Sequence, residues 1–264
     1  MNGQVLHKRI TMVTFNIAHG RGLSLYQGFK TERKIRRNLI KISELLLNEG
    51  ADIVALQEVD VDSHWNRNLN LLEIIRKHAE FQFADIGIHN RREGPKPLSY
   101  GNAVLSRYPF HNFECNPFGN NTIGEKGFLY VELNIGEHVL PLINLHLDFR
   151  SRQRRIVQVD RIIDYIVEKN SSHDCKTIKP IICGDFNSGS KKYGDAVETL
   201  FSHVCSHGDY NMYPENARTF PAQLPTACID FVMLPAEYRL LRCDVVKSYA
   251  SDHRPVVVEF EITV

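Results

Sequence analysis

The stretch ICGDFNSGS, residues 182–190, decides how the rest of the chain is interpreted. An apolar run that begins at Ile181 stops at Gly184, and a carboxylate, Asp185, and an amide, Asn187, follow. Residues two positions apart share a face of a strand, so both polar groups could act on one small ligand. Asp, Asn, Gly and Ser are also common in turns, so this stretch alone does not separate a site from a turn.

The composition indicates a globular protein with a substantial core. Of the 264 residues, 43% are hydrophobic and 24% are charged, which is close to the globular average. The sequence has no internal repeat, low-complexity tract or obvious linker, so we expect one domain over residues 1–264. The formal net charge of +1 lacks the basic excess that is typical of sequence-independent nucleic-acid binding.

Cysteine usage and the N-terminus favour a cytosol-like compartment. The six cysteines form no C-x-x-C pair, which argues against zinc ribbons and thioredoxin-type sites and suits reduced, buried thiols. The opening MNGQVLHKRITMV lacks the apolar region of a signal peptide, and no run is long enough to span a bilayer. We therefore expect a cytoplasmic protein without a transmembrane segment, monomeric by default.

Apolar patterning predicts many strands and few helices. A helical stripe over 31–50 has possible caps at Thr31 and Gly50, and a second stripe over 151–170 consists of Ile156, Val159, Ile163 and Ile166. Weaker helical patterns cover 68–79 and 193–203. Strands are predicted at 10–15, 52–57, 102–106, 128–135, 139–147, 179–185, 229–234 and 255–262, with a hairpin turn at Gly136–Glu137. This set predicts a mixed sandwich with helices packed outside.

Polar residues mark the ends of these predicted strands. Four strands carry one at the C-terminal end and two carry one at the start: Asn16, Glu58, His146 and Asp185, then Asp230 and the pair Asp252–His253. If the last two strands run antiparallel to the first four, all of these positions meet at one edge. Converging polar groups at strand ends are the usual architecture of a functional site.

The residue types indicate metal-assisted phosphate chemistry. Glu58 is a hard oxygen ligand that could hold Mg²⁺, or Mn²⁺ in its place, with waters and phosphate oxygens completing the shell. Asp230 could orient His253 and favour an imidazolium, which stabilises charge on a phosphate. Asp185 could deprotonate a water, and Asn187 could hold that water or a phosphate oxygen. No nucleophile elbow, P-loop or H-E-x-x-H motif competes.

Seven short motifs carry a resemblance to a known family: TFNI, LQEVD, YGNAVLSRYP, NLHLD, GDFN, IDFV and SDHRP, in this order. Together they resemble the endonuclease/exonuclease/phosphatase superfamily of Mg²⁺-dependent phosphodiesterases and phosphatases, from about Ile10 to Phe260. Each motif alone is weak, but the ordered set is specific. The resemblance implies an α/β fold, a four-layer α/β/β/α sandwich with two mixed β-sheets face to face and helices outside.

The resemblance also implies a role for each matched position. One group would hold the metal, and the other would contact the scissile phosphate, activate water and supply an acid–histidine pair. The implied metal positions are Asn16, which is also near the phosphate, Glu58 and Asp252, and the implied catalytic positions are His146, Asp185, Asn187, Asp230 and His253.

Two departures disfavour an AP endonuclease within this family. Ala18 stands where those enzymes usually carry an acid two positions after the first Asn, and NLHL stands where they carry an Asn-rich loop with a Tyr. YGNAVLSRYP and TFPAQLP instead resemble a broadly spread branch of bacterial metal-dependent hydrolases. Membership of that branch implies a reaction type rather than a substrate.

Several further residues have both a functional and a structural interpretation. Tyr100 and Asn102 could line the phosphate pocket or form a simple turn. Arg150 and Arg154 could bind an anionic substrate, since cations at a helix start oppose the helix dipole, or could simply face water. Both interpretations also stay open for three further positions. Arg91, Arg92 and Lys96 could bind a polyanion or lie in an ordinary surface loop. Trp65 could stack on a base or sugar or simply pack, and His19 could reach the site near Asn16 or not.

These expectations converge on an Mg²⁺-dependent phosphoric-ester hydrolase, in first place a phosphodiesterase, whose water is activated by Asp185. The alternatives are a nuclease acting on DNA or RNA and a non-catalytic module that binds a phosphate ligand on the same fold. The complete set of acids and histidines favours the enzyme. The substrate is a phosphate ester, and nucleic acid, a phospholipid head group and small phosphoesters all stay open.

Overall fold

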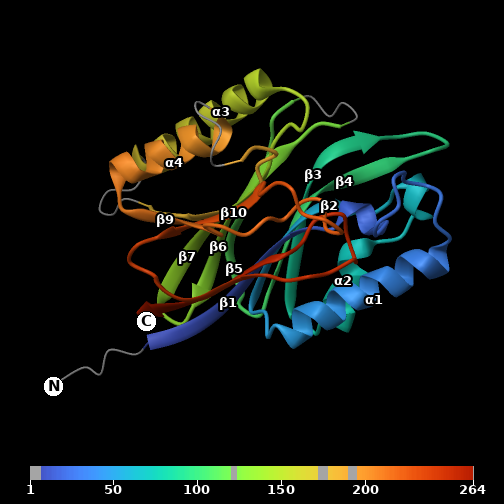
Figure 1. Ribbon diagram of the computed structural model, residues 1–264, viewed down its shortest axis with the longest axis horizontal. Helices are drawn as coiled ribbons and strands as arrows, with labels where there is room; N and C mark the ends of the chain where they lie inside the picture. The colour runs from blue at the N-terminus through green and yellow to red at the C-terminus, as the bar shows by residue number, and fades with distance from the viewer. Residues whose placement is uncertain (1–6, 120–123, 172–177, 190–194, 264) are drawn as a thin grey trace.

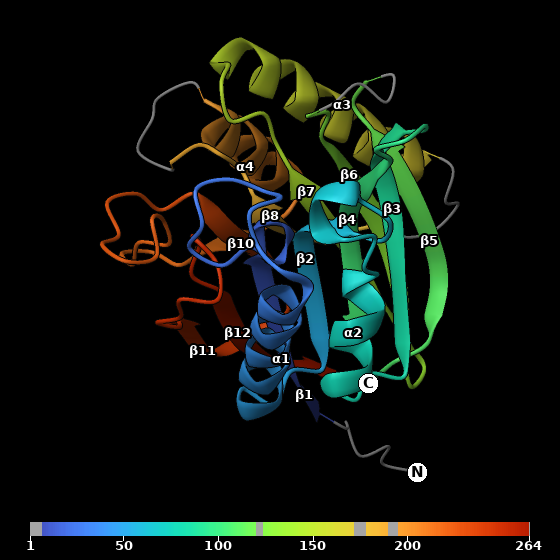
Figure 2. The same cartoon turned by 90° about the vertical axis from the view of Figure 1, so that its right-hand side faces the viewer.

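The chain folds into four layers, with two six-stranded sheets packed face to face and two helices on the outer face of each sheet (Figures 1 and 2). The computed structural model describes residues 7–119, 124–171, 178–189 and 195–263. The layer order confirms the α/β/β/α sandwich that the sequence predicts.

The first sheet has the strand order β11-β12-β1-β2-β4-β3. β1 and β2 are parallel, and every other neighbouring pair is antiparallel. The bounds are β1 (His7–Asn16), β2 (Ile53–Asp60), β3 (Phe83–Arg92), β4 (Leu98–Ser106), β11 (Arg239–Val245) and β12 (Val256–Thr263).

The second sheet has the strand order β5-β6-β7-β8-β10-β9. Its one parallel pair is β7 with β8, and β10 runs antiparallel to β8. The hairpin expected at Gly136–Glu137 joins β6 to β7. The bounds are β5 (Phe110–Pro117), β6 (Gly127–Ile135), β7 (His138–His146), β8 (Ile181–Asp185), β9 (Tyr210–Tyr213) and β10 (Asp230–Pro235).

Four helices cover the outer faces of the sheets, close to their predicted places. They are α1 (Glu32–Asn48), α2 (Leu71–His78), α3 (Arg152–Ser171) and α4 (Ala196–His207). Thr31 caps α1 by accepting a hydrogen bond from the Lys34 N–H, and Gly50 follows the helix with φ +64°. The start expected for α4, at residue 193, lies outside the described residues.

The buried face of α3 differs from the predicted stripe. Ile162 takes the inward position expected for Ile163, and Arg155 takes the one expected for Ile156. Arg155 can be buried because its guanidinium pairs with the Asp195 carboxylate, with Nη2 2.8 Å from Oδ2. Hydrophobic periodicity cannot reveal this position, since the partner lies forty residues away in sequence.

Three apolar clusters hold the four layers together. One lies between α1, α2 and the first sheet, the second between the two sheets, and the third between the second sheet and the pair α3 and α4. Fully buried members of the three clusters are Ile42 and Leu56, Val131 and Val258, and Ile162 and Phe231, respectively. The site therefore sits on a rigid, close-packed frame.

The four strands that the sequence does not predict are the four outer strands of the sheets: β3, β11, β5 and β9. Outer strands are partly exposed and carry fewer apolar residues, so their pattern is weak. The prediction that Arg91 and Arg92 lie in a surface loop is wrong, because both arginines lie on β3.

Two further expectations can be compared with the described residues. All cysteines found there are free thiols, but only Cys183 is buried, and Cys115 and Cys205 are exposed. The expectation of uniformly buried thiols is therefore wrong. None of the helices within the described ranges has the length and apolar character needed to cross a bilayer.

Candidate active site

One edge of the sandwich collects the polar strand ends, and we call it the site edge. β1, β2, β7 and β8 end there, whereas β10 and β12 begin there because each runs antiparallel to its neighbour. In the second sheet, Asp185 is the register partner of both His146 on β7 and Asp230 on β10. The topology thus brings together positions that are far apart in sequence.

Gly184 fixes the approach to Asp185. Its φ is +136°, and a Cβ at this position would lie 1.9 Å from the carbonyl oxygen of Leu145 on the neighbouring strand. Glycine alone permits this close backbone contact. The Gly184–Asp185 pair in the opening stretch is therefore strand geometry, and the structure does not place Asp185 in a simple turn.

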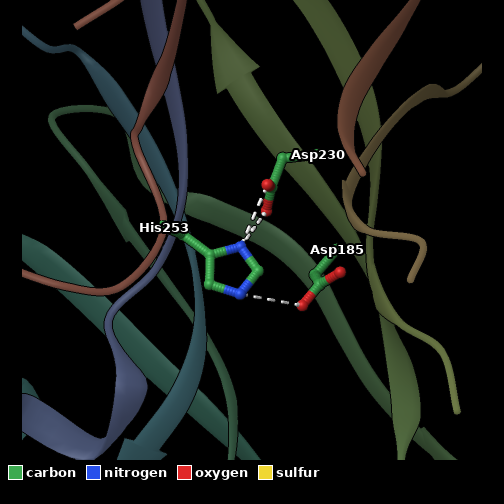
Figure 3. Close-up of side chains that lie close together, drawn as sticks. All are labelled: Asp185, Asp230 and His253. Atoms are coloured by element: carbon green, nitrogen blue, oxygen red, sulfur yellow. Dashed lines mark hydrogen bonds and ion pairs between the residues drawn. The ribbon is translucent and has the colours of Figure 1, made fainter. Parts of the chain in front are cut away.

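His253 lies between two buried carboxylates (Figure 3). Its Nδ1 is 3.0 Å from both Asp230 oxygens, and its Nε2 is 3.7 Å from Asp185 Oδ2. Burial alone would lower the pKa of His253, but the charges of Asp230 and Asp185 outweigh it and raise the pKa above its ordinary value. His253 is therefore an imidazolium at neutral pH, oriented by Asp230.

Asp185 is surrounded by hydrogen-bond donors. Its Oδ2 accepts from the Asn16 side-chain amide at 2.9 Å and lies 3.4 Å from His146 Nε2, while its Oδ1 accepts from the Asn187 backbone N–H at 2.9 Å. Burial raises the pKa of Asp185, and the positive charge of His253 opposes this rise. The Asn187 side chain donates to the Leu147 carbonyl at 2.9 Å rather than to Asp185.

Glu58 faces the site from a bulge in β2. The pairing of β2 with β4 shifts register between Leu56 and Val59, and Glu58 has a φ of +56°. Its Oε1 lies 3.2 Å from Lys126 Nζ and its Oε2 lies 3.4 Å from His19 Nε2. Burial would raise the pKa of Glu58, but these positive neighbours hold it well below its usual range.

His19 is held by a second buried acid. Its Nδ1 lies 2.8 Å from Asp60 Oδ2, and the Trp65 indole N–H and the Asn66 amide also donate to Asp60. His19 contacts Glu58, so it lies at the candidate site, and its part in the function stays a prediction. The Trp65 ring packs edge-on against His19 with 5.2 Å between ring centroids, which supports the packing interpretation.

The oxygen donors at the site edge fit a hard divalent cation. The side chains of Glu58 and Asp252 are 18% and 24% exposed, and cationic groups already lie against both carboxylates. Carboxylates with room for waters and phosphate oxygens are the donors that Mg²⁺ prefers. Asn16 is less available, because its carbonyl oxygen accepts the Ala18 N–H at 3.0 Å and its amide donates to Asp185.

A second group of possible ligands suits the cation less well. Ligand atoms of Asp185, Asp230 and His253 lie within 4.8 Å of one another. His253 Nδ1, however, already bonds both oxygens of Asp230, so a cation held by all three would have to break these bonds. The existing Asp230–His253 bonds favour a proton-bearing group at this position.

Tyr100 and Asn102 lie under the site on β4, so the interpretation of both as turn residues is wrong. The Tyr100 hydroxyl accepts the Gly124 N–H at 3.1 Å. The Asn102 amide donates to the carbonyl oxygens of Gly127, at 3.3 Å, and Asn144, at 3.2 Å. Their place in the phosphate pocket stays a prediction.

The two candidate arginines lie outside the buried cluster. The Arg150 guanidinium stacks on the Phe149 ring, 4.9 Å from its centroid, and the Arg154 side chain is 75% exposed with Nη1 3.7 Å from Asp148 Oδ2. Arg154 lines a cavity of about 540 Å³ between the first turns of α3 and the segment before β6. Its wall includes Asp148, which follows His146 by two residues in sequence.

Lys126 is the site residue that the sequence analysis misses. It precedes β6, which runs antiparallel to β7 and pairs Gly127 with His146, so it also stands at the site edge. The rule that selected Asp230 and His253, a polar group at the start of a strand, would have found Lys126 if cations had been counted.

The chain is similar to known proteins over most of its length. A family model described as the Endonuclease/Exonuclease/phosphatase family matches residues 13–253. The uncharacterized protein YbhP of Escherichia coli K12 is 25% identical over 221 residues, which cover 79% of this chain and 81% of YbhP.

Solved structures with similar folds include two proteins from Bacteroides thetaiotaomicron. An endonuclease/exonuclease/phosphatase family protein has a TM-score of 0.72 at 14% identity, covering 99% of this chain and 98% of that one. A mannosyl-6-phosphatase has a TM-score of 0.68 at 14% identity, covering 95% and 99%. At these identities the likeness concerns the fold alone.

Proposed function

Because the chain belongs to the endonuclease/exonuclease/phosphatase family, whose members are hydrolases acting on phosphoesters, we propose that it is an Mg²⁺-dependent phosphoric-ester hydrolase and that its substrate is a phosphodiester. The observation that carries this proposal is the chain of contacts from Asp230 through His253 to Asp185. A buried imidazolium aimed at a buried carboxylate is costly for a fold and useful for phosphate chemistry.

Asp185 is the proposed base. Its pKa is raised by burial, so it accepts a proton more readily than an exposed carboxylate does. In the proposed step the water oxygen bonds to phosphorus, the bond to the leaving oxygen breaks, and Asp185 takes the proton of the water. Asn16 and the Asn187 N–H hold the carboxylate in place.

The positive groups around Asp185 stabilise the charge that develops on the phosphate. His253 supplies a fixed imidazolium, and His146 presents its Nε2 to the same Asp185 oxygen, Oδ2. The pKa of His146 is lowered well below its ordinary value by burial and by the charge of Lys126, so His146 acts as a neutral donor.

Glu58, with Asp252, would hold the divalent cation, for which Mn²⁺ can substitute for Mg²⁺. Bound there, the cation supplies Lewis-acid polarisation of the phosphoryl oxygens. Glu58 suits this role because it stays ionised and partly open to solvent.

The cavity at the first turns of α3 supports a diester over a monoester. A diester carries a second substituent that needs its own space, and we assign that substituent to the cavity of about 540 Å³ that Glu125, Asp148 and Arg154 line. The organisation of residues 1–264 as one domain, a monomeric state and a cytoplasmic location remain further proposals.

Hydrolysis of bis-p-nitrophenyl phosphate and of p-nitrophenyl phosphate, each measured with Mg²⁺, with Mn²⁺ and after EDTA, tests the proposal. We expect faster turnover of the diester, loss of turnover in EDTA, and recovery when the cation is added back. The variant Glu58→Gln should need a much higher cation concentration. Turnover that survives EDTA, or binding of phosphate ligands without any turnover, would contradict the proposal.

A further inference from the structure

Lys126 is a buried cation to which the function proposed above assigns no contact with the substrate. The residue is 9% exposed, and its Nζ lies 3.2 Å from Glu58 Oε1 and 3.3 Å from His146 Nδ1. An ammonium donates only, so His146 Nδ1 is the acceptor in this contact and Nε2 carries the hydrogen. That hydrogen faces Asp185. Lys126 thus links Glu58, the proposed ligand of the divalent cation, through His146 to Asp185, the proposed base.

Buried side chains hold the backbone at three positions around Lys126, namely residues 124, 125 and 127. The Tyr100 hydroxyl accepts from Gly124, the Asn102 amide donates to Gly127, and the Asn90 side chain makes two bonds to the Glu125 backbone. Asn90, Tyr100 and Asn102 are all at most 6% exposed. Three buried polar side chains bond the backbone of one four-residue segment, which indicates that the fold fixes the position of Lys126.

Gly127 adds a further constraint on the same segment. A Cβ there would lie 2.7 Å from the Asn116 carbonyl oxygen and 2.8 Å from the His89 ring. The residue after Lys126 must therefore be glycine for β6 to start this close to its neighbours. The lysine is delivered into the site by a backbone that has little freedom to move.

The charge around Lys126 changes when a substrate complex forms. Its present carboxylate partner is Glu58, which is the group that would bind the divalent cation. Once the Glu58 oxygens are engaged in that way, the ammonium faces a second positive charge and needs a new anion. A non-bridging oxygen of the substrate phosphate, held between His146 and His253, is the anion that this chemistry supplies.

We propose that Lys126 is a further catalytic residue, whose ammonium pairs with Glu58 in the free protein and binds a non-bridging phosphate oxygen in the substrate complex. This inference rests on the proposed function, and it adds a positive group borne by the protein itself. Lys126 would stabilise the phosphate charge in the transition state together with His253.

The test compares Lys126→Met, Lys126→Arg and the control Lys41→Met, which removes an exposed lysine on α1. On bis-p-nitrophenyl phosphate, Lys126→Met should lower kcat/KM by about 100-fold, the typical loss when one donor to a developing oxyanion is removed. Lys126→Arg should keep part of the activity because it keeps the charge, and Lys41→Met should match the wild type.

Two equilibrium measurements separate this role from a structural one. Mn²⁺ binding, followed by electron paramagnetic resonance without substrate, should be as tight or tighter in Lys126→Met, because a competing charge next to Glu58 is gone. Inorganic phosphate, titrated in the presence of Mg²⁺, should bind about 10-fold more weakly, the loss expected for one charge-assisted hydrogen bond.

Wild-type turnover in Lys126→Met, or an unchanged phosphate affinity, would overturn the inference. Weaker Mn²⁺ binding would also overturn it, since Lys126 would then support Glu58 rather than contact phosphate. If the wild type hydrolyses no phosphoester, the proposed function fails by itself, and the Mn²⁺ and phosphate titrations still decide the place of Lys126.

Discussion

The site edge and the opposite edge of the sandwich are built from different kinds of backbone. At the opposite edge, the turn after α1 and the hairpin between β6 and β7 use glycine, Gly50 and Gly136, where φ is positive. At the site edge, glycines such as Gly20 and Gly184 also have positive φ, but residues with side chains join them there, including Ala18, Glu58 and Asn187. Among the described residues with side chains and positive φ, Glu80 alone lies at the opposite edge.

This difference indicates where the fold accepts strain. A residue with a Cβ in the left-handed region costs roughly 1 kcal/mol or more, and such residues persist only where the surroundings enforce them. The β2 bulge directs the Glu58 side chain into the site, and the turn at Asn187 directs its backbone N–H to Asp185 Oδ1. At the opposite edge no side chain has to be directed into a site, and Gly50 and Gly136 adopt positive φ there without strain.

The largest expected effect is the loss of turnover in Asp185→Asn. Removing the proposed base should lower kcat on bis-p-nitrophenyl phosphate on the order of 10³-fold. Stability should move the other way, since the raised pKa of buried Asp185 means that its ionised form destabilises the folded state. The melting temperature of the variant should therefore exceed that of the wild type.

The pH dependence of that gain follows from the same shift. Above the unfolded pKa of an aspartate the wild type carries the cost of a buried charge, and below it both states are protonated and the cost disappears. The gain of Asp185→Asn should be larger at pH 8 than at pH 4. A variant that melts below the wild type at both pH values would show that the ionised Asp185 carboxylate does not destabilise the site edge.

The Arg155–Asp195 pair tests whether every buried charge near the site edge serves catalysis. The substitution Asp195→Asn keeps a side chain that can cap α4 but leaves the buried guanidinium without its anion. We expect a loss of about 3–5 kcal/mol in the free energy of unfolding at pH 7, by urea denaturation, with kcat unchanged in the folded protein.

The sign of its pH dependence is opposite to that of Asp185. Burial raises the pKa of Asp195, but the bonds from Arg155 outweigh it and lower the pKa. The stabilisation is therefore complete above the unfolded pKa, about 3.9, and is lost as pH falls through the folded value. The wild type and Asp195→Asn should converge in stability at acidic pH. A constant difference from pH 7 to pH 3 would contradict the ion pair.

A smaller effect is expected for Asn90→Ala, which removes the two bonds to the Glu125 backbone. The ammonium of Lys126 would then be placed less accurately, so kcat should fall about 10-fold with little change in KM. Asp85→Ala on the exposed part of β3 is the matched control. Equal kcat values in the two variants would show that the bonds between Asn90 and the Glu125 backbone do not affect catalysis.

The sequence predicts most of the site because strand ends are visible in it. Asp185 stands after an apolar run and Asp230 before one, and antiparallel pairing of their strands is enough to place them side by side. His253 follows the same rule on the first sheet. The resemblance assigned roles to these positions, and the topology explains why positions this distant can act together.

Three features were missed in the sequence, for separate physical reasons. The outer strands β3, β5, β9 and β11 are half exposed, so alternation of apolar residues is weak in them. Burial of Arg155 depends on a partner that only the fold brings near. Lys126 lies in GEKG, which has the composition of a solvated turn, and only the contacts with Glu58 and His146 show it to be buried.

The smallest expected effect compares one glycine with one alanine at the two edges. Gly136→Ala puts a Cβ at φ +66° in the hairpin between β6 and β7, and nothing lies within 4 Å of that Cβ. Only backbone strain is added, so the free energy of unfolding should fall by about 1 kcal/mol while kcat/KM stays at the wild-type value. Ala18→Gly is the reciprocal change, since Ala18 has φ +47°.

Ala18→Gly should not destabilise the protein, because glycine adopts this φ without strain and the lost methyl group is small. Its kcat/KM should nevertheless fall by a few-fold, since the Ala18 N–H donates to the side-chain Oδ1 of Asn16 and a looser backbone holds this side chain less firmly. Urea denaturation and kinetics on the two variants complete the comparison. If Gly136→Ala lowered turnover and Ala18→Gly did not, strain at the site edge would have no bearing on the reaction.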